Sequence, residues 1–316
     1  MRRGIGLVLI ALGAFFLVLA PLVKYYAVPK LAVAPLDLDP NDPSLSAGTA
    51  KTLLDLKTLT ELTDVPVTST RFTTADVAAS EQAGGNTGVY DTFSRVNRAD
   101  GTLVTASTQR YAFDRTTNVM YAEAGANVDG DPITAEMTAG DAIMPLKLPF
   151  FVDKSATYNY FDTTLMKGYP LTFVEETSID GLTVYKFESK IEPVQIGEQE
   201  GLGERVGGTA DFVAPRFYTN DRVVFVEPLT GQVVDGFEDQ KQTFRGPDGT
   251  DKITIIDAKI GFTPEEKADS VAAAKTNASL LNLLSNVVPI ASLIIGLVLL
   301  VIGILLVRGT DQPAAS

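Results

Sequence analysis

The two ends of the chain are uncharged, strongly apolar stretches, and they constrain the fold more than any motif between them. Residues 4–23 and 287–307 contain no Asp, Glu, Lys or Arg. A hydrocarbon core about 30 Å thick is crossed by about 20 helical residues. We therefore expect one transmembrane helix at 4–23 and a second at 287–307, with the polar domain of the chain between them.

Basic residues at the chain ends predict which side of the membrane the polar domain occupies. Arg2 and Arg3 precede the first apolar stretch, and Arg308 follows the second. Because basic residues favour the cytoplasmic side, we expect both termini in the cytoplasm and the domain outside it. A cleaved signal peptide is the alternative for the first stretch. Pro21, directly after a Val-Leu-Ala triplet, argues against cleavage.

Small residues recur at helical spacing in both apolar stretches. Gly6 and Gly13 are seven residues apart, as are Gly296 and Gly303, and Ser292 precedes Gly296 by four. Seven residues make two helical turns, so each pair lies on one helix face. Because small residues let membrane helices approach closely, we predict that the two helices pack through these five positions. The alternative is that glycine is simply common in membrane helices.

Composition argues against several classes of function. The chain has no His and no Cys, and its formal net charge is −13. It therefore lacks a thiolate nucleophile, a Ser-His-Asp triad and the usual zinc ligands. Its acidity would repel nucleic acid. We expect no enzyme activity, no cofactor, no metal site and no nucleic-acid partner. The Asp-rich segments 37–42 and 127–131 are interpreted as solvated turns, with calcium binding as the alternative.

The residues from Val65 onward have the pattern of an antiparallel β protein. Strand-like runs flank turn signals at 100–101, 180–181, 228–231 and 247–249,. We therefore predict a mainly β fold, an antiparallel meander or barrel-like sheet. Strands that are apolar on both faces indicate either two packed sheets or one sheet wrapped around an apolar interior.

Two groups of side chains are candidates for the lining of such an interior. Tyr158, Tyr160 and Phe161 form an aromatic cluster in the sequence, and Val224 and Val226 lie on one face of a strand,. These residues predict either an apolar wall in contact with a lipid-like molecule or ordinary core packing.

A helix start follows the last strand. Thr263 is a suitable N-cap, Pro264 suits the first turn, and Glu266 would complete a capping box,. We predict a stalk helix that leads to the second membrane span. The expected order is a cytoplasmic N-terminus (1–3), a membrane helix (4–23), an extracytoplasmic β-rich domain (24–262), a stalk helix (263–286), a membrane helix (287–307) and a cytoplasmic tail (308–316).

Three segments carry a resemblance to a known family. They are Leu-Pro-Phe-Phe-Val-Asp-Lys-Ser-Ala-Thr-Tyr-Asn-Tyr-Phe-Asp at 148–162, Glu-Thr-Ser-Ile-Asp-Gly-Leu-Thr-Val-Tyr-Lys-Phe at 176–187, and Val-Glu-Pro-Leu-Thr-Gly at 226–231. Together with the two spans, they resemble the porin PorA-like family of actinobacterial cell-envelope proteins. The resemblance implies the plasma membrane of such a bacterium and a channel-type role, and it supplies no catalytic residue.

The first functional hypothesis is a non-enzymatic envelope protein that holds or conducts apolar molecules such as lipids, or forms a pore as an oligomer. Two helical spans in one chain enclose no pore, so conduction through the bilayer would require several copies. The expected partners are membrane lipids, further copies of the chain or other envelope proteins. The alternative hypothesis is a structural protein that organises envelope partners.

Overall fold

A computed structural model of the protein describes residues 2–308, which divide into two compact units. The helical unit contains the described residues up to Val33 and from Lys275 onward, and the β unit is Ala34–Ala274. Residue 1 and residues 309–316, which belong to the expected cytoplasmic ends, lie outside the described residues.

The helical unit is formed by two helices, Arg2–Leu31 and Pro264–Arg308, and the second of these begins in the β unit. Each is long and apolar enough to cross a membrane. Their segments are α1 (Arg2–Leu22), η1 (Val23–Ala27) and α2 (Val28–Leu31) in the first, and α4 (Pro264–Asn282), η3 (Leu283–Val287) and α5 (Val288–Arg308) in the second.

Both helices contain one π-helical turn, η1 and η3, and each turn ends directly before a Val-Pro pair. Val28 N donates to Val23 O, and Val288 N donates to Leu283 O, five residues back in each case. A proline ring clashes with the carbonyl four residues before it and offers no N–H to that carbonyl. The wider π turn moves this carbonyl away from the proline ring. This explains why a π turn precedes the Val-Pro pair in both helices.

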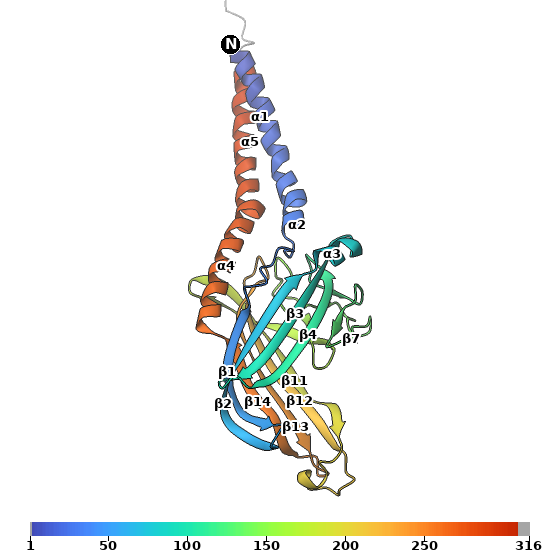
Figure 1. Ribbon diagram of the computed structural model, residues 1–316. Coiled ribbons are helices and arrows are strands. Elements are labelled where there is room, and N and C mark those ends of the chain that lie inside the picture. The colour runs from blue at the N-terminus through green and yellow to red at the C-terminus, as the bar shows by residue number, and fades with distance from the viewer. Residues whose placement is uncertain (1, 309–316) are drawn as a thin grey trace, which may run out of the picture. The chain divides into compact units, whose positions relative to one another are not determined.

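The β unit is mainly strand, as the sequence predicts (Figure 1). Besides the beginning of α4, its helical segments are α3 (Val77–Ala83) and the short η2 (Glu204–Val206). Its strands are β1 (Ser44–Asp55), β2 (Thr60–Ala75), β3 (Thr87–Arg98), β4 (Leu103–Asp114), β5 (Met120–Tyr121), β6 (Asn127–Val128), β7 (Asp131–Pro132), β8 (Ala142–Ile143), β9 (Tyr158–Asp162), β10 (Lys167–Ile179), β11 (Leu182–Gln199), β12 (Ala214–Val226), β13 (Val233–Arg245) and β14 (Asp251–Phe262).

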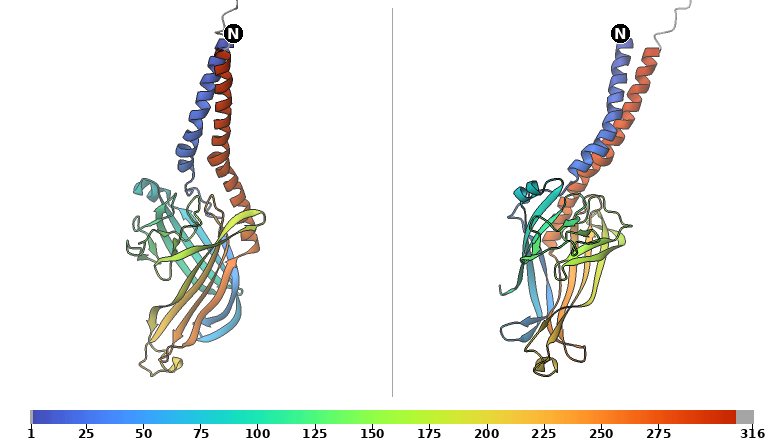
Figure 2. Two further views of the ribbon diagram at one scale, coloured as in Figure 1. Left: turned by 180° about the vertical axis from the view of Figure 1, so that it is seen from behind. Right: turned by 90° about the vertical axis from the view of Figure 1, so that its right-hand side faces the viewer.

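One 14-stranded sheet contains all of these strands. Its order is β7-β6-β4-β3-β2-β1-β14-β13-β12-β11-β10-β9-β8, and β5 pairs with β4. The pairings are antiparallel except for β8 with β9. The sheet curls until its two margins meet at one end, where Val119, just before β5, bridges Ile143 in β8. Figures 1 and 2 show the long strands as a strongly curved wall, so the barrel-like form of the prediction is confirmed.

A bend in β10 folds the last strands over the concave face of the sheet. Residues 167–171 pair with β9, whereas residues 172–179 pair with β11. Because of this change of partner, β9 lies across the inside of the barrel and contacts β12, which is three strands away in the sheet order. The Tyr218 hydroxyl of β12 donates to Asp162 at the end of β9 over 3.1 Å.

Apolar clusters lie at the two ends of the β unit. At the end where the margins meet, Phe113, Met144 and Phe161 are fully buried. Leu36 and Leu38, from the segment before β1, pack against them. At the other end, the loop between β11 and β12 folds back through η2. Its Val206 packs on Ala214 and Phe244, and Arg205 Nη2 donates to Leu59 O in the β1–β2 turn. The interior between these ends contains the groups described below.

The start of α4 differs from the expected capping box. Thr263 Oγ1 accepts from Glu266 N over 3.1 Å, as an N-cap should,. The Glu266 carboxylate, however, accepts from Leu45 N at the start of β1 over 2.9 Å. The capping-box prediction is therefore wrong in its second half. Glu266 fastens the beginning of the helix to the sheet, a long-range contact that the local sequence pattern does not contain.

Candidate functional site

The glycines of the two apolar helices lie opposite one another in the helical unit. A Cβ placed on Gly13 would lie 2.8 Å from Gly296 O, and one placed on Gly6 would lie 2.9 Å from Gly303 O. These distances leave no room for any side chain. The helices therefore run antiparallel, with their backbones in contact at both glycine pairs. We call this line of contact the helix seam, and Ser292 is buried beside it.

The helix seam contains one more pair of buried residues that the sequence analysis did not identify. Ala20 follows Gly13 by seven residues and is 2% exposed. Pro289 precedes Gly296 by seven residues and is also buried. A seven-residue spacing of small residues keeps one contact line along two supercoiled helices. The same spacing that identified the glycines would have found Ala20 as well.

We predict that Gly13→Leu separates the two helices, because its Cβ would meet two main-chain atoms, Gly296 O and Leu300 N, which cannot rotate aside as the nearby Leu300 side chain can. Leu17→Cys and Ser292→Cys place thiols four residues from Gly13 and Gly296 in the same register, and the chain has no native cysteine. A short bismaleimide should link them in membranes. Gly13→Leu should remove most of this product, whereas Gly4→Leu, with open space at its Cβ, should not. Equal yields in the two leucine variants would contradict the close seam.

The predicted apolar lining residues lie in two different core clusters of the β unit. Tyr160, Val224 and Val226 are buried together, with Tyr158 partly buried against them. Phe161 belongs instead to the cluster at the closed end of the barrel. Adjacent residues of a strand point to opposite faces, which is why Tyr160 and Phe161 separate. The structure thus brings four of the five residues together, packed against one another.

The inward face of β12 carries polar groups that the sequence reasoning missed. Arg222 is 7% exposed in its side chain and lies between two carboxylates: Asp162, 3.4 Å from Nη2, and Glu238, 2.8 Å from Nε. The Arg222 guanidinium also sits 4.5 Å from the centre of the Tyr160 ring. The Asn220 amide donates to Glu238 over 3.2 Å. We call Asp162, Ser189, Asn220, Arg222 and Glu238 the interior polar cluster.

Electrostatics keep the arginine and its exposed partner charged. Burial alone raises the pKa of Glu238, but the charge and hydrogen bond of Arg222 outweigh it and hold that pKa below its usual value. Burial likewise lowers the pKa of Arg222, and the nearby Glu238 carboxylate and other acidic groups reverse the effect. Removing a charged group from water costs on the order of several kcal/mol unless partners of opposite charge compensate it. Here the acidic partners of Arg222 provide that compensation.

A second arginine faces the same interior from the opposite wall. Arg71 lies on β2. Burial raises the pKa of Tyr160 on β9, and the charges of Arg222 and Arg71 oppose that rise; the same two charges help to lower the pKa of Glu238 on β13. Arg71 is exposed although it points inward, and 40% of the Glu238 side chain is exposed too. The interior beside the cluster is therefore open to solvent. Within residues 2–308, Arg71 forms no ion pair, and its single hydrogen bond runs from Nε to Ser94 Oγ over 3.4 Å.

Three buried atoms of the interior polar cluster have no hydrogen-bond partner among residues 2–308: Ser189 Oγ, Asn220 Oδ1 and Arg222 Nη1. The three residues are 1–6% exposed. Buried polar atoms in proteins are nearly always paired, and groups such as these take ordered water or a polar part of a ligand. The interior polar cluster thus offers a ligand two hydrogen-bond acceptors and one charged donor.

The sequence contains one signal for this cluster. Arg216, Tyr218, Asn220 and Arg222 alternate along β12 with residues of the other face. Thr219 and Asp221 on the other face are polar too, so this alternation is a weak signal of one polar face,. Only the bend in β10, which has no sequence signal of its own, turns that face into a buried site by placing Asp162 and Tyr160 over it.

Aspartate side chains of both Asp-rich segments accept hydrogen bonds, from within the turn in one segment and from β4 in the other. Asp39 Oδ1 accepts from Asn41 N over 2.8 Å. Asp129 accepts from Thr108 N and from Ser107 Oγ. Among residues 2–308, no group of three or more His, Cys, Asp or Glu side chains is arranged to hold a metal ion. The absence of a metal site and of a cofactor remains a prediction.

Comparison with known proteins identifies the family. The family Porin PorA matches residues 5–305. A Porin PorA of Corynebacterium amycolatum is 26% identical over 341 residues, which cover 88% of this chain and 87% of that protein. A Porin PorA of Corynebacterium resistens is 25% identical over 406 residues, which cover 97% of each chain. Because the match runs from the first apolar helix, through the strands, to the second, this chain belongs to the Porin PorA family.

Proposed function

We propose that this membrane or cell-envelope protein uses the interior of its β unit to hold an amphiphilic molecule with an anionic end. The observation that carries the proposal is the pair of inward-facing arginines, Arg71 and Arg222, each with N–H groups that have no partner among residues 2–308. Both termini would lie in the cytoplasm and the β unit on the opposite side of the membrane, as the basic residues at the ends favour.

The anionic end would be recognised by the interior polar cluster. Arg222 Nη1 is a charged donor, and Arg71 adds a second guanidinium that solvent reaches. Guanidinium groups bind carboxylate and phosphate oxygens through short, charge-assisted hydrogen bonds. Ser189 Oγ and Asn220 Oδ1 would accept hydrogen bonds from hydroxyl groups of the same ligand.

An apolar wall next to the cluster supports an amphiphile over a fully polar solute. Val67 lies four residues before Arg71 on β2 and so shares its face, and Ile260 lies directly opposite Glu238 in the sheet register,. Both belong to one cluster with several partly buried side chains: Val65, Val96, Val104 and Ile256. Apolar surface that remains partly accessible inside a barrel suits a hydrocarbon segment.

Mass spectrometry of the full-length protein, purified in detergent, tests the proposal. We expect a co-purifying anionic amphiphile whose occupancy falls about tenfold in Arg71→Gln, because a hydrogen bond to a charged group contributes about 1.5–3 kcal/mol. Arg95→Gln is the matched control, since Arg95 follows Ser94 on β3 and therefore points to the outer face. No bound amphiphile in the wild-type protein, or equal loss in both variants, would overturn the proposal.

A pore formed by several copies is the second candidate, and the family name favours it. The two helices of one chain enclose no channel, so conduction needs an assembly. Planar-bilayer recording from purified oligomer measures it directly. Conductance that persists in Arg71→Gln would assign the pore to the helices, whereas conductance altered by that change would involve the β unit. A protein with neither ligand nor conductance would favour the scaffolding alternative.

A further inference from the structure

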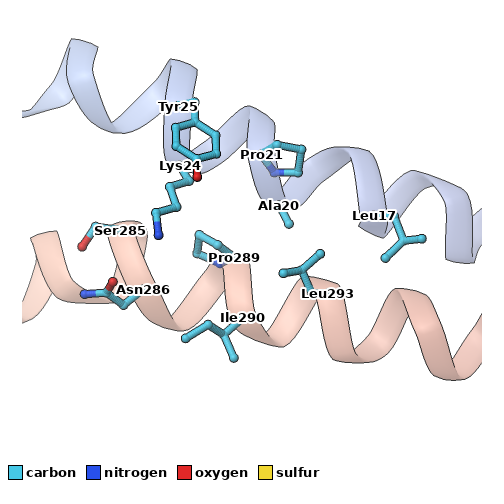
Figure 3. Close-up of a pocket in the computed structure, with 10 residues that line it drawn as sticks. All are labelled: Leu17, Ala20, Pro21, Lys24, Tyr25, Ser285, Asn286, Pro289, Ile290 and Leu293. Carbon is cyan, nitrogen blue, oxygen red and sulfur yellow. The ribbon is translucent and has the colours of Figure 1, made fainter.

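A cleft opens between the two apolar helices where their π-helical turns face each other. Its volume is about 330 Å³. Figure 3 shows Lys24 reaching from η1 toward Ser285 and Pro289 on the other helix, with Tyr25 and Asn286 at the same end of the cleft. These residues make one end of the cleft polar and positively charged.

The polar end has two groups free to bind a ligand. Within residues 2–308, Lys24 has no ion pair, and its nearest aromatic ring is that of Tyr25, with the ring centre 5.9 Å from Nζ. Ser285 is 6% exposed, and its hydroxyl oxygen has no hydrogen-bond partner among the described residues. A buried hydroxyl without a partner is rare. Both residues lie on π-helical turns, which occur frequently at functional sites.

The other end of the cleft is apolar. Leu17, Ile290 and Leu293 line it, and all three belong to the apolar stretches that cross the membrane. Lys24 directly follows the first apolar stretch, where a span meets the headgroup layer. The cleft therefore passes from hydrocarbon depth to headgroup depth along a few helical turns, with its positive charge at the headgroup end.

We propose that this cleft is a binding site for one anionic phospholipid of the surrounding bilayer. Lys24 Nζ pairs with the lipid phosphate, the Ser285 hydroxyl donates to a phosphate oxygen, and an acyl chain lies against Leu17, Ile290 and Leu293. A lipid satisfies all three features at once: charge, the lone hydroxyl and the apolar floor. A soluble anion would leave the apolar end unoccupied, and a neutral lipid would leave Lys24 without its counter-ion.

Native mass spectrometry of the full-length protein released from nanodiscs tests the site. The nanodiscs contain equal amounts of phosphatidylglycerol and phosphatidylcholine. We expect one retained phosphatidylglycerol per chain in the wild-type protein. Lys24→Gln should reduce its retention about fivefold, since one basic residue near the lipid surface contributes about 1 kcal/mol. Ser285→Ala should reduce it by a smaller factor.

Lys30→Gln is the matched control. Lys30 lies on the same helix but is engaged by Tyr26, whose hydroxyl is 3.0 Å and whose ring centre is 4.2 Å from Nζ, and it does not line the cleft. It should retain the lipid as the wild type does, and circular dichroism should show unchanged helix content in each variant. Equal loss in Lys30→Gln and Lys24→Gln, or equal retention of phosphatidylcholine, would overturn the proposal.

Discussion

Gly231→Ala is expected to destabilise the β unit severely, whereas Gly249→Ala is not. Both glycines lie in turns with positive φ, 71° and 75°. They differ in what a Cβ would meet. At Gly231 it would lie 2.1 Å from Leu148 O and 2.3 Å from Pro149 O, and at Gly249 it would meet nothing within 4 Å. The pair therefore separates backbone strain from steric exclusion.

The expected magnitudes follow from these two terms. A non-glycine residue in the left-handed region costs about 1–2 kcal/mol, and both variants share that cost. Only Gly231→Ala must also push two main-chain carbonyls away. Overpacking of this kind costs about 1–3 kcal/mol or more, because backbone cannot rotate aside as a side chain can. We expect a further fall in the melting temperature of about 5–10 °C for a unit of this size.

Thermal unfolding of the full-length protein, followed by circular dichroism in the β-sheet region, measures the difference. Gly249→Ala should melt within a few degrees of the wild type, as about 1–2 kcal/mol implies. Equal melting temperatures for Gly231→Ala and Gly249→Ala would show that the close approach of 148–149 to the turn contributes nothing to stability.

The same contact explains two of the sequence motifs. The turn 226–231 and the segment 148–152 dock on each other: Leu148 N donates to Gly231 O over 2.8 Å, and Val152 N donates to Pro228 O over 2.7 Å. Inside the turn, the buried Glu227 carboxylate accepts from Thr230 N over 2.7 Å. Both motifs are therefore structural, and they join β12 and β13 to the strands that close the barrel.

Local patterns predicted the part of the fold that local interactions build. All four expected hairpins are present. Three have Asp-Gly turns with positive φ at Gly101, Gly181 and Gly249, and the fourth has positive φ at Gly231. Strand alternation then follows from the hairpin register. The glycine spacing in the apolar ends likewise depends on helix geometry alone.

Contacts between distant parts of the chain could not be predicted in this way. Asp162 meets Arg222 only because β10 changes partner in mid-strand, and Glu266 meets Leu45 across more than 200 residues. An apolar run such as 223–226 gives no indication of whether the next residues of the same strand, Asn220 and Arg222, face a ligand or a core. Pairing between distant strands decides this, and it leaves no period in the sequence.

Lys147→Met is expected to stabilise the protein, and most strongly in acid. The Lys147 ammonium is buried against the Phe150 ring, with the ring centre 3.8 Å from Nζ, and it has no hydrogen-bond partner among residues 2–308. Burial lowers the pKa of Lys147 to about 7. The unfolded chain keeps the ordinary value near 10.5. This difference corresponds to at most about 5 kcal/mol, at about 1.4 kcal/mol per pKa unit.

The sign of the pH dependence follows from the two values. Below about pH 7 the amine is protonated in both states, and the folded state bears the whole cost of the buried charge. Between about pH 7 and 10.5 the unfolded state binds more protons, so the free energy of unfolding rises with pH. Above that range both states are neutral and the cost disappears.

Chemical denaturation of the full-length protein at pH 6, 8 and 10 measures this cost. Lys147→Met has no charge to bury, so it should exceed the wild type most at pH 6 and approach it at pH 10. Lys154→Met is the matched control, because Lys154 has a side chain 53% exposed and should show no comparable gain at pH 6. A difference between Lys147→Met and wild type that is constant across the three pH values would contradict a buried amine. In that case the gain would come from packing of the methionine side chain alone.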